Sequence, residues 1–337
     1  MYSRSKFLQK TCPTYFDKVK YFTGRAFCYK EEKPSQSSGN HAAVCLLYSR
    51  MDDGDLLKLA KHFNMSETAY ISGIESDLLE PKGDIFLSEN RFRLRWFTPT
   101  VEVPLCGHAT VVSAKALYEY GNKHTEFEFE TQSGDLIATI DSEGNVSLDF
   151  PSNFPRQLFT QDSRAGVRFD PDIMVTIEDE QFQLYNDIAT KTLPYHQYNN
   201  RELWYSPQTK KLVVYLPDAG EENLRKLDPD FSVLLASHDG SLVKGVIVTC
   251  LDKHGSFDFF SRYFAPWNGI NEDPVTGSAH TVIGPMYAIK LKKLELRANQ
   301  VSKTGGEMQI KLKDYSSFNA TRIQLTGKAC CDENGYL

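Results

Sequence analysis

The sequence predicts an α+β protein made of two related domains, each a sheet in two layers or a roll with one central helix. Three observations support this. The length of 337 residues suits about two domains. A set of short motifs recurs in the same order in both halves, and each half contains several strand-like segments around one apolar helical segment. We place the boundary near Phe150–Arg156, where two prolines lie close together, and expect domains over residues 1–155 and 156–337.

The repeat consists of three matched motifs, and internal repeats are a strong guide to architecture. The first is an Arg-aromatic-Phe-x-Pro pentapeptide, the second a Gly-containing turn that opens a helical segment, and the third a Gln/Ser stretch before an alternating segment. In the two halves these are Arg95–Pro99 and Arg262–Pro266, Cys106–Thr110 and Thr276–His280, and Gln132–Gly134 and Gln300–Ser302. Their common order predicts two domains related by a pseudo-twofold axis.

Hydrophobic periodicity assigns the individual elements. Apolar runs and period-2 alternation predict strands over 41–48, 91–97, 126–130, 135–141, 211–216, 256–263, 307–313 and 322–329. Apolar residues at helical spacing predict helices over 53–64, 109–120 and 279–291, and Pro285 should kink the last one because it lacks a backbone donor. The last strand could stay in the second domain or cross back to the first.

Composition excludes several classes of function. Lys and Arg total 38 against 44 Asp and Glu, a net charge of −6, which disfavours nucleic-acid binding. The longest apolar run, Ala42–Tyr48, is too short to span a membrane, and the first residues lack the apolar segment of a secretory signal, so we expect a cytoplasmic protein. The seven cysteines form no CxxC pair and predict free thiols without a metal site. Dinucleotide, phosphate-loop and zinc-protease motifs are absent, so we expect no cofactor.

The two Gly-containing turns are candidate ligand sites. Gly107 and Gly277 each precede a helical segment, and a helix N-terminus offers free N–H groups and partial positive charge to an anion such as a carboxylate. His108 lies at the first turn, and Asp273 and Ser278 lie at the second, so groups suited to proton transfer gather there. The alternative is that the glycines only cap helices and the polar residues only form structural hydrogen bonds.

Several segments together resemble the phenazine-biosynthesis (PhzF-like) isomerase family. In chain order they are Ser38–Cys45, Phe63–Ala69, Leu94–Pro99, Leu105–Thr110, Glu272–His280 and Gln300–Gly306. The similarity extends from about Val19 to Ala329, and Glu272–His280 with Ser66–Thr68 are its most specific parts. The resemblance implies the diaminopimelate-epimerase-like fold, in which each domain wraps a sheet around a central helix, and a cleft between the domains. It also implies cofactor-free chemistry and frequently a homodimer.

The resemblance also assigns roles to individual residues. Glu67 matches the general acid/base, His108 and Asp273 match the polar groups that act with it, and Gly107, Gly277 and Ser278 match the substrate-binding turns. We therefore predict an isomerase that shifts a proton and a double bond in a small carboxylate-bearing metabolite. His41, Lys20 and Lys303–Thr304 depart from the family pattern and bear on which substrate is used.

Two alternatives stay open. Epimerases of this fold use one thiolate at each helix N-terminus, and Cys106 could be one such base. Its counterpart in the repeat is Thr276, whose hydroxyl is too weak a base, so single-carboxylate isomerisation is favoured. The second alternative is a non-catalytic scaffold that binds a metabolite or a protein.

Overall fold

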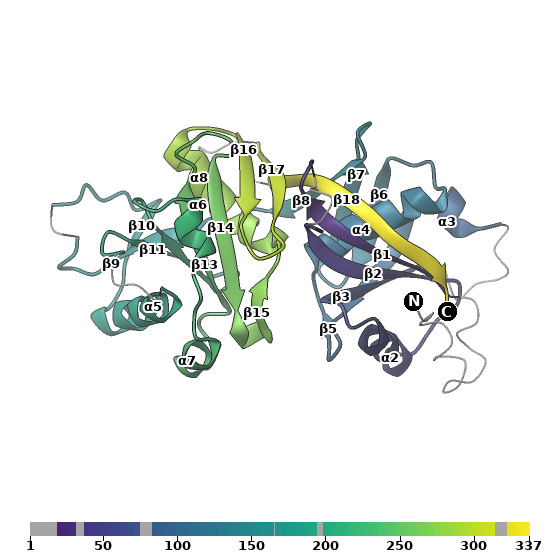
Figure 1. Ribbon diagram of the computed structural model, residues 1–337, viewed down its shortest axis with the longest axis horizontal. Coiled ribbons are helices and arrows are strands. Elements are labelled where there is room, and N and C mark those ends of the chain that lie inside the picture. The colour runs from purple at the N-terminus through teal and green to yellow at the C-terminus, as the bar shows by residue number, and fades with distance from the viewer. Residues whose placement is uncertain (1–18, 32–36, 75–82, 165, 194–197, 314–321) are drawn as a thin grey trace. The chain divides into compact units, whose positions relative to one another are not determined.

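The computed structural model describes residues 19–31, 37–74, 83–164, 166–193, 198–313 and 322–337, which form two compact units (Figure 1). The first unit contains Met1–Cys28, Asn40–Asp149 and Thr326–Leu337, and the second contains Tyr29–Gly39 and Phe150–Leu325. The units therefore differ from the simple halves 1–155 and 156–337. The reason is long-range strand pairing: β18 (Arg322–Tyr336) leaves the second unit and pairs antiparallel with β1 (Lys20–Cys28).

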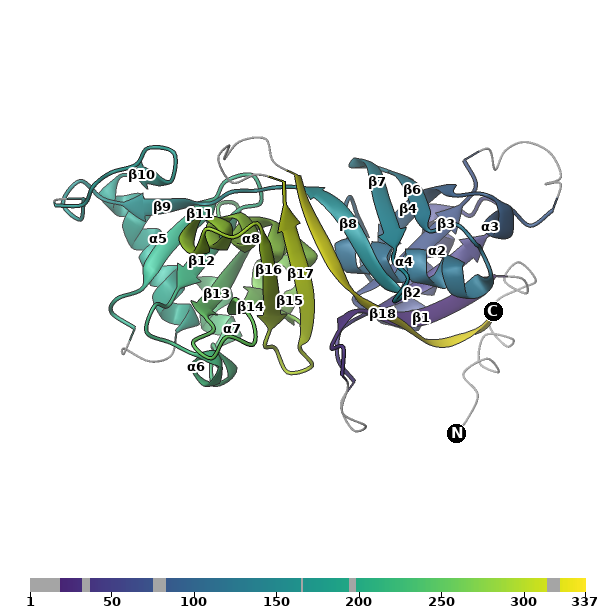
Figure 2. The same ribbon diagram turned by 90° about the horizontal axis from the view of Figure 1, so that it is seen from above.

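The first unit is a sheet wrapped around a helix. Its other strands are β2 (Asn40–Leu47), β3 (Glu67–Ser72), β4 (Arg91–Phe97), β5 (Glu102–Val103), β6 (Glu126–Thr131), β7 (Gly134–Ile140) and β8 (Asn145–Pro151). Pairing runs β18-β1-β2-β3-β4-β6-β7-β8, and β8 pairs with β18, which closes the sheet. The helix α4 (Gly107–Tyr120) contacts β1, β2, β3 and β7 and is buried on nearly all sides from His108 to Leu117 (Figure 2). Two further helices are α2 (Asp53–Phe63) and α3 (Ile85–Ser88).

The second unit is a sheet with helices on both faces. Its strands are β9 (Arg156–Phe159), β10 (Met174–Thr176), β11 (Glu202–Ser206), β12 (Lys211–Tyr215), β13 (Gly245–Leu251), β14 (Phe259–Ala265), β15 (Ile270–Asp273), β16 (Glu295–Gln300) and β17 (Gly306–Leu312). Its helices are α5 (Asp179–Thr192), α6 (Glu221–Arg225), α7 (Phe231–Ala236), the 3-10 turn η1 (Pro266–Asn268) and α8 (Gly277–Leu291). Side chains alternate along the strands. Leu212, Val246 and Phe264 pack into the core that includes α5, whereas Phe259 stacks on Tyr287 of α8 at a centroid distance of 4.1 Å.

The same succession of strand pairs occurs in both units. β1–β2 and β11–β12 are antiparallel, β2–β3 and β12–β13 are parallel, and β3–β4 and β13–β14 are antiparallel. β4–β6 and β14–β16 are then parallel, and β6–β7 and β16–β17 are antiparallel. In both units the central helix follows the short strand that pairs with β4 or β14. The recurrence of sequence motifs thus coincides with a recurrence of pairing.

Most expected elements are present, and the differences have local causes. The predicted strand over 256–263 begins only at Phe259, because the Asp252 carboxylate accepts hydrogen bonds from the amides of His254 and Phe257 and forms a turn. The strand predicted over 322–329 extends to Tyr336 because β1 continues to pair with it. The helix α8 continues through Pro285. Within the described residues no helix has the length and apolar character needed to cross a membrane, and six cysteines are free thiols.

Candidate active site

Glu67 is placed by a sharp change of direction between α2 and β3. The helix α2 ends at Asn64, whose left-handed conformation (φ 50°) suits asparagine better than most residues. Three residues later the chain enters β3 at Glu67, which pairs in parallel register with Ala42 of β2. The Glu67 side chain is 12% exposed. A carboxylate is thereby held at the start of a central strand and mostly out of solvent.

His108 meets Glu67 from the first turn of α4. Its Nε2 lies 3.1 Å from Glu67 Oε2, while its Nδ1 lies 3.3 Å from Asn40 Nδ2 and 3.5 Å from Cys106 Sγ. Both Nε2 and Oε2 are buried, and neither has a well-aligned hydrogen bond within the described part of the chain. The two side chains are therefore in close electrostatic contact. Both atoms can still form a hydrogen bond, and a bound molecule could provide the partner.

The charge state of this pair follows from its surroundings. Burial alone would lower the pKa of His108, but Cys106 and Glu67 outweigh it and hold that pKa well above its ordinary value. Burial, reinforced by Glu67, raises the pKa of the Cys106 thiol. The thiol is therefore neutral near pH 7, and we assign the favourable charge to the Glu67 carboxylate. The His108 imidazolium can therefore act as a hydrogen-bond donor, and the Glu67 carboxylate beside it can act as a base.

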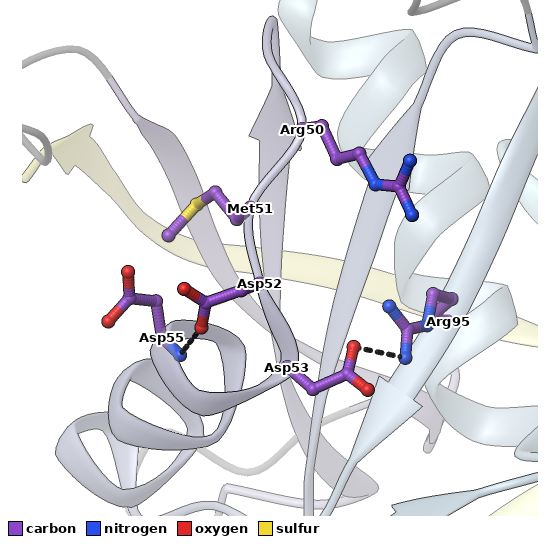
Figure 3. Close-up of a pocket in the computed structure, with 6 residues that line it drawn as sticks. All are labelled: Arg50, Met51, Asp52, Asp53, Asp55 and Arg95. Carbon is purple, nitrogen blue, oxygen red and sulfur yellow. Dashed lines mark hydrogen bonds and ion pairs between the residues drawn. The ribbon is translucent and has the colours of Figure 1, made fainter.

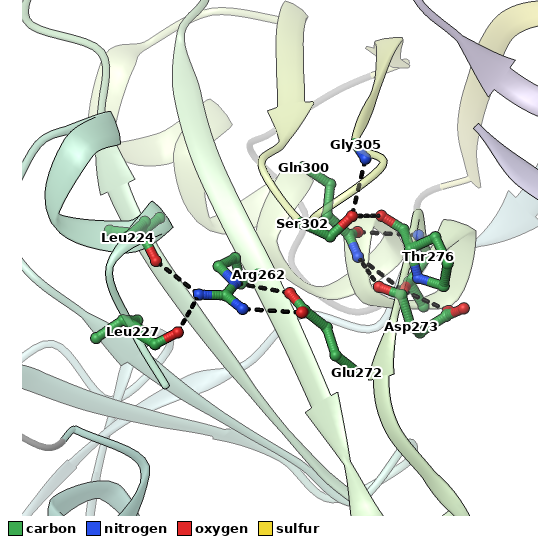
Figure 4. A network of polar contacts seen from close by, with 10 residues as sticks. Leu224, Leu227, Arg262, Glu272, Asp273, Thr276, Gln300, Ser302 and Gly305 are labelled. Carbon is green, nitrogen blue, oxygen red and sulfur yellow. Dashed lines mark hydrogen bonds and ion pairs between the residues drawn. The ribbon is translucent and has the colours of Figure 1, made fainter. Parts of the chain in front are cut away.

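Asp273, Gly277 and Ser278 lie at the end of β15 and the start of α8 in the second unit. Figure 4 shows Asp273 beside Thr276, the residue before that helix. The Asp273 carboxylate accepts a hydrogen bond of 2.5 Å from the Thr276 hydroxyl. Gln300 holds the same turn, since its Nε2 donates to the Asp273 carbonyl and its Oε1 accepts from the Thr276 amide. Gly277 and Ser278 then begin α8, where the first amides have no acceptor within the helix, and Ser278 is exposed. These hydrogen bonds hold the turn before α8 in place, and the first amides of the helix can bind a ligand.

The structure thus brings the predicted residues together in two sets. Glu67, Gly107 and His108 form one set in the first unit, and Asp273, Gly277 and Ser278 form the other in the second. That both sets face one cleft stays a prediction.

Sequence reasoning missed two residues that position these sets. Asn40 contacts His108, and Gln300 contacts the Asp273 turn. Asn40 lies in the family-like segment Ser38–Cys45, and Gln300 lies in the third motif of the repeat. A polar side chain within these segments was the available signal. His280, near the second turn, is fully buried; its Nδ1 lies 2.7 Å from the Thr276 carbonyl, and burial lowers its pKa to about 4. Its environment is that of a structural, neutral histidine.

Glu67, Cys106 and His108 are also of the residue types that bind metals, with ligand atoms within 4.8 Å of one another. Their contacts, however, lie on opposite edges of the imidazole: Glu67 is beside Nε2 and Cys106 is beside Nδ1. This arrangement suits a chain of polar contacts better than one metal centre.

A cavity of about 710 Å³ lies elsewhere in the first unit, beside the start of α2 (Figure 3). It is lined by Arg50, Met51, Asp52, Asp53, Asp55 and Arg95 and contains none of the predicted site residues. Asp52 caps α2 by accepting from the Asp55 amide, and Asp53 pairs with Arg95. These structural contacts account for Asp52, Asp53 and Arg95, and we assign this cavity no function.

Comparisons with known proteins identify the family. The family model described as phenazine biosynthesis-like protein matches residues 32–335. A bovine phenazine biosynthesis-like domain-containing protein is 39% identical over 305 residues, covering 89% of this chain and 93% of its own. An uncharacterized isomerase of Halalkalibacterium halodurans is 35% identical over 312 residues, covering 91% and 94%. The crystal structure of a PhzF-family phenazine biosynthesis protein from Enterococcus faecalis matches with a TM-score of 0.69 at 30% identity, covering 95% of this chain and 100% of that one. The chain belongs to the phenazine biosynthesis-like (PhzF) family, with its diaminopimelate-epimerase-like α+β fold.

Proposed function

We propose that this protein is a cofactor-independent isomerase that shifts a proton and a double bond in a small, unsaturated, carboxylate-bearing metabolite. The observation that carries the proposal is the buried contact between Glu67 and His108 at the N-terminus of α4. The name of the bacterial relative, an uncharacterized isomerase, supports the reaction class.

In this mechanism Glu67 is the general base and then the general acid. It removes a proton from a carbon next to the unsaturated system and returns it to another carbon on the same face. One carboxylate suffices because an allylic shift, unlike racemisation, can redeliver the proton on the side from which it came. His108, kept protonated by the neighbouring carboxylate, donates to an oxygen on which negative charge develops.

The second unit would supply substrate binding. Asp273 and Ser278 hold polar groups of the substrate, and the N-termini of α4 and α8 bind its carboxylate through Gly107 and Gly277. This step requires the two units to form one cleft, with the sheet-wrapped helices related by a pseudo-twofold axis, and it is part of the proposal.

Epimerisation by two thiols has less support. The pKa of Cys106 is raised, and the corresponding hydroxyl, on Thr276, donates its hydrogen bond to Asp273. Neither group is poised as a base. A non-catalytic scaffold is the remaining alternative, and it is an outcome of the test below.

The test starts from a metabolite screen by thermal shift, followed by measurement of solvent deuterium uptake into each hit. Glu67→Gln keeps the size and hydrogen bonding of the side chain and removes the base, so uptake should fall by roughly 10²–10⁴-fold. Glu130→Gln is the matched control, because Glu130 pairs with Arg93 in the same unit and is not part of the site. Equal uptake by wild type and Glu67→Gln would contradict the proposed base, and the absence of uptake into every hit would favour the scaffold.

A further inference from the structure

Lys211 is a buried cation that no step of the proposed mechanism uses. It is the first residue of β12 and is 7% exposed. Its Nζ lies 5.5 Å from the centroid of the Tyr263 ring, and within the described residues no carboxylate approaches it to ion-pair distance and no group hydrogen-bonds to it. Burying an ammonium group without a paired charge is strongly unfavourable, so a fold that keeps one there calls for an explanation.

The strand registers place this amine on the face of the sheet that carries the second central helix, α8. Lys211 is paired with Gly245 of β13, and Tyr263 of β14 is paired with Asp273 of β15. Alternation puts Lys211 and Tyr263 on the face of the sheet that carries α8, as shown by the contact of Ser261 Oγ with His280 at 3.5 Å. Asp273 is the carboxylate whose charge acts on the amine, and three residues later Thr276 begins the first turn of α8.

The same registers show what stands at this position in the first unit. Glu67 begins β3 and is paired with Ala42, whereas Gly245 begins β13 and is paired with Lys211. Gly245 thus occupies in the second unit the position that Glu67 occupies in the first, and Lys211 occupies the position of Ala42. A Cβ at Gly245 would overlap the Tyr263 ring, so the glycine lets that ring lie across the strand toward Lys211. A cation therefore stands beside the strand position that corresponds to Glu67, the anion that contacts His108 at the start of α4.

We infer that Lys211, with the free amides of Gly277 and Ser278, forms a binding site for a carboxylate group of the substrate. The inference rests on the proposed function for the identity of the ligand as a small carboxylate. The ammonium supplies the full positive charge that the helix N-terminus alone lacks. The substrate carboxylate supplies an ion-pair partner in contact with Lys211, since Asp273 acts on the amine only from beyond ion-pair distance. Burial lowers the pKa of Lys211 to about 8 although Asp273 opposes the shift, so the amine is still mostly protonated at pH 7.

The test uses benzoate, a planar carboxylate that offers no transferable proton, so that binding is measured apart from turnover. Its affinity for the full chain is determined by calorimetric titration at pH 7, with chloride replaced to keep ionic strength constant. Lys211→Met should weaken binding at least about tenfold, and Lys211→Arg should retain part of it. Lys290→Met is the matched control: Lys290 also lies over an aromatic ring, 4.3 Å from the Tyr215 centroid, but is paired with Glu202.

The outcomes separate this inference from the proposed reaction. Removal of an unpaired buried charge should leave the unfolding midpoint of Lys211→Met unchanged or raised, which checks that the variant is folded. Unchanged benzoate affinity in Lys211→Met, or no benzoate binding by wild type at tens of millimolar, would overturn the inference. Glu67→Gln should bind benzoate at least as well as wild type while losing deuterium uptake, so failure of the base leaves the carboxylate site standing.

Discussion

The N-termini of α4 and α8 share a framework and differ in chemistry. Each is preceded by an Arg–Glu ion pair between neighbouring strands, Arg95 with Glu102 and Arg262 with Glu272, and each helix begins with a glycine. The segments Glu102–His108 and Glu272–Ser278 differ at four positions, one of which only exchanges aliphatic side chains, Leu105 for Val275. Val103, Cys106 and His108 in the first segment are replaced by Asp273, Thr276 and Ser278 in the second. The ion pair, the proline and the glycine are thus kept, and the changes include the side chains to which we assign catalysis and substrate binding.

This comparison leads us to propose a division of labour. The first turn holds the carboxylate–imidazole pair, which suits proton transfer. The second holds hydroxyl and carboxylate groups beside a buried ammonium, which suits binding and orientation of a substrate. The predictions that follow test this asymmetry in order of decreasing effect.

The largest difference is expected between His108→Gln and Ser278→Ala. Loss of the imidazolium should lower the rate of deuterium uptake at saturating substrate by about 10²-fold or more. Loss of the Ser278 hydroxyl should instead weaken substrate binding by about 1–3 kcal/mol and change the saturated rate little. Uptake kinetics over a range of substrate concentrations separate the two effects. If both variants lowered the saturated rate equally, the proposal that the first turn catalyses and the second turn binds would be contradicted.

The two buried histidines should give opposite pH dependences of stability. His280 has a folded pKa of about 4 against an ordinary value of 6.5, so the unfolded chain binds its proton first as pH falls. Its contribution is present above pH 6.5 and is lost between about pH 6.5 and 4, a change of about 3 kcal/mol. The folded pKa of His108 is raised, so its contribution is present below about pH 6.5 and is lost as pH rises through the folded pKa.

Urea unfolding at several pH values measures these contributions. The free energy of unfolding of wild type minus that of each His→Gln variant should fall with decreasing pH for His280 and with increasing pH for His108. The same sign for both residues would show that their environments do not differ as described.

A packing difference within the helices should have a smaller effect. Gly284 of α8 occupies the place that Ala114 occupies in α4, counting from Gly107 and Gly277. A Cβ at Gly284 would lie 2.8 Å from Ile323 Cδ1 and 3.1 Å from Ile310 Cγ2. Gly284→Ala should therefore destabilise the protein by about 1–3 kcal/mol, although alanine favours helix formation. Thermal and urea unfolding measure this, and a stabilised variant would mean that the surrounding strands can move apart at no cost.

The smallest effect is expected for Cys106→Ala. The thiol is buried and its pKa is raised, so it is no base near pH 7 and its removal should leave deuterium uptake nearly unchanged. Cys106→Ser is the conservative comparison because it retains a polar contact with the imidazole. Loss of uptake in both variants would revive the thiol-based epimerase.

Local sequence patterns were sufficient for the helices and strands that we expected and for the two turns, but they missed other elements, among them α5, β1 and β13. The apolar spacing in Ala109–Tyr120 and the alternation in Arg91–Phe97 follow from which faces are buried, and those faces are encoded by neighbouring residues. The glycines at the helix starts and the residues around them were visible for the same reason. Family resemblance added the role of Glu67, which as an isolated acid after a helix has no distinguishing pattern.

Only the tertiary structure decided which of these residues meet. Three examples join residues that are far apart in the chain. They are the pairing of β18 with β1, the 3.1 Å contact of Glu67 with His108 and the approach of Lys211 to Tyr263. Such contacts depend on strand register, and a register is fixed by the packing of a whole face and not by the residues of one segment. The charge of His108 and the neutrality of His280 likewise follow from what surrounds each ring, which a sequence position alone does not specify.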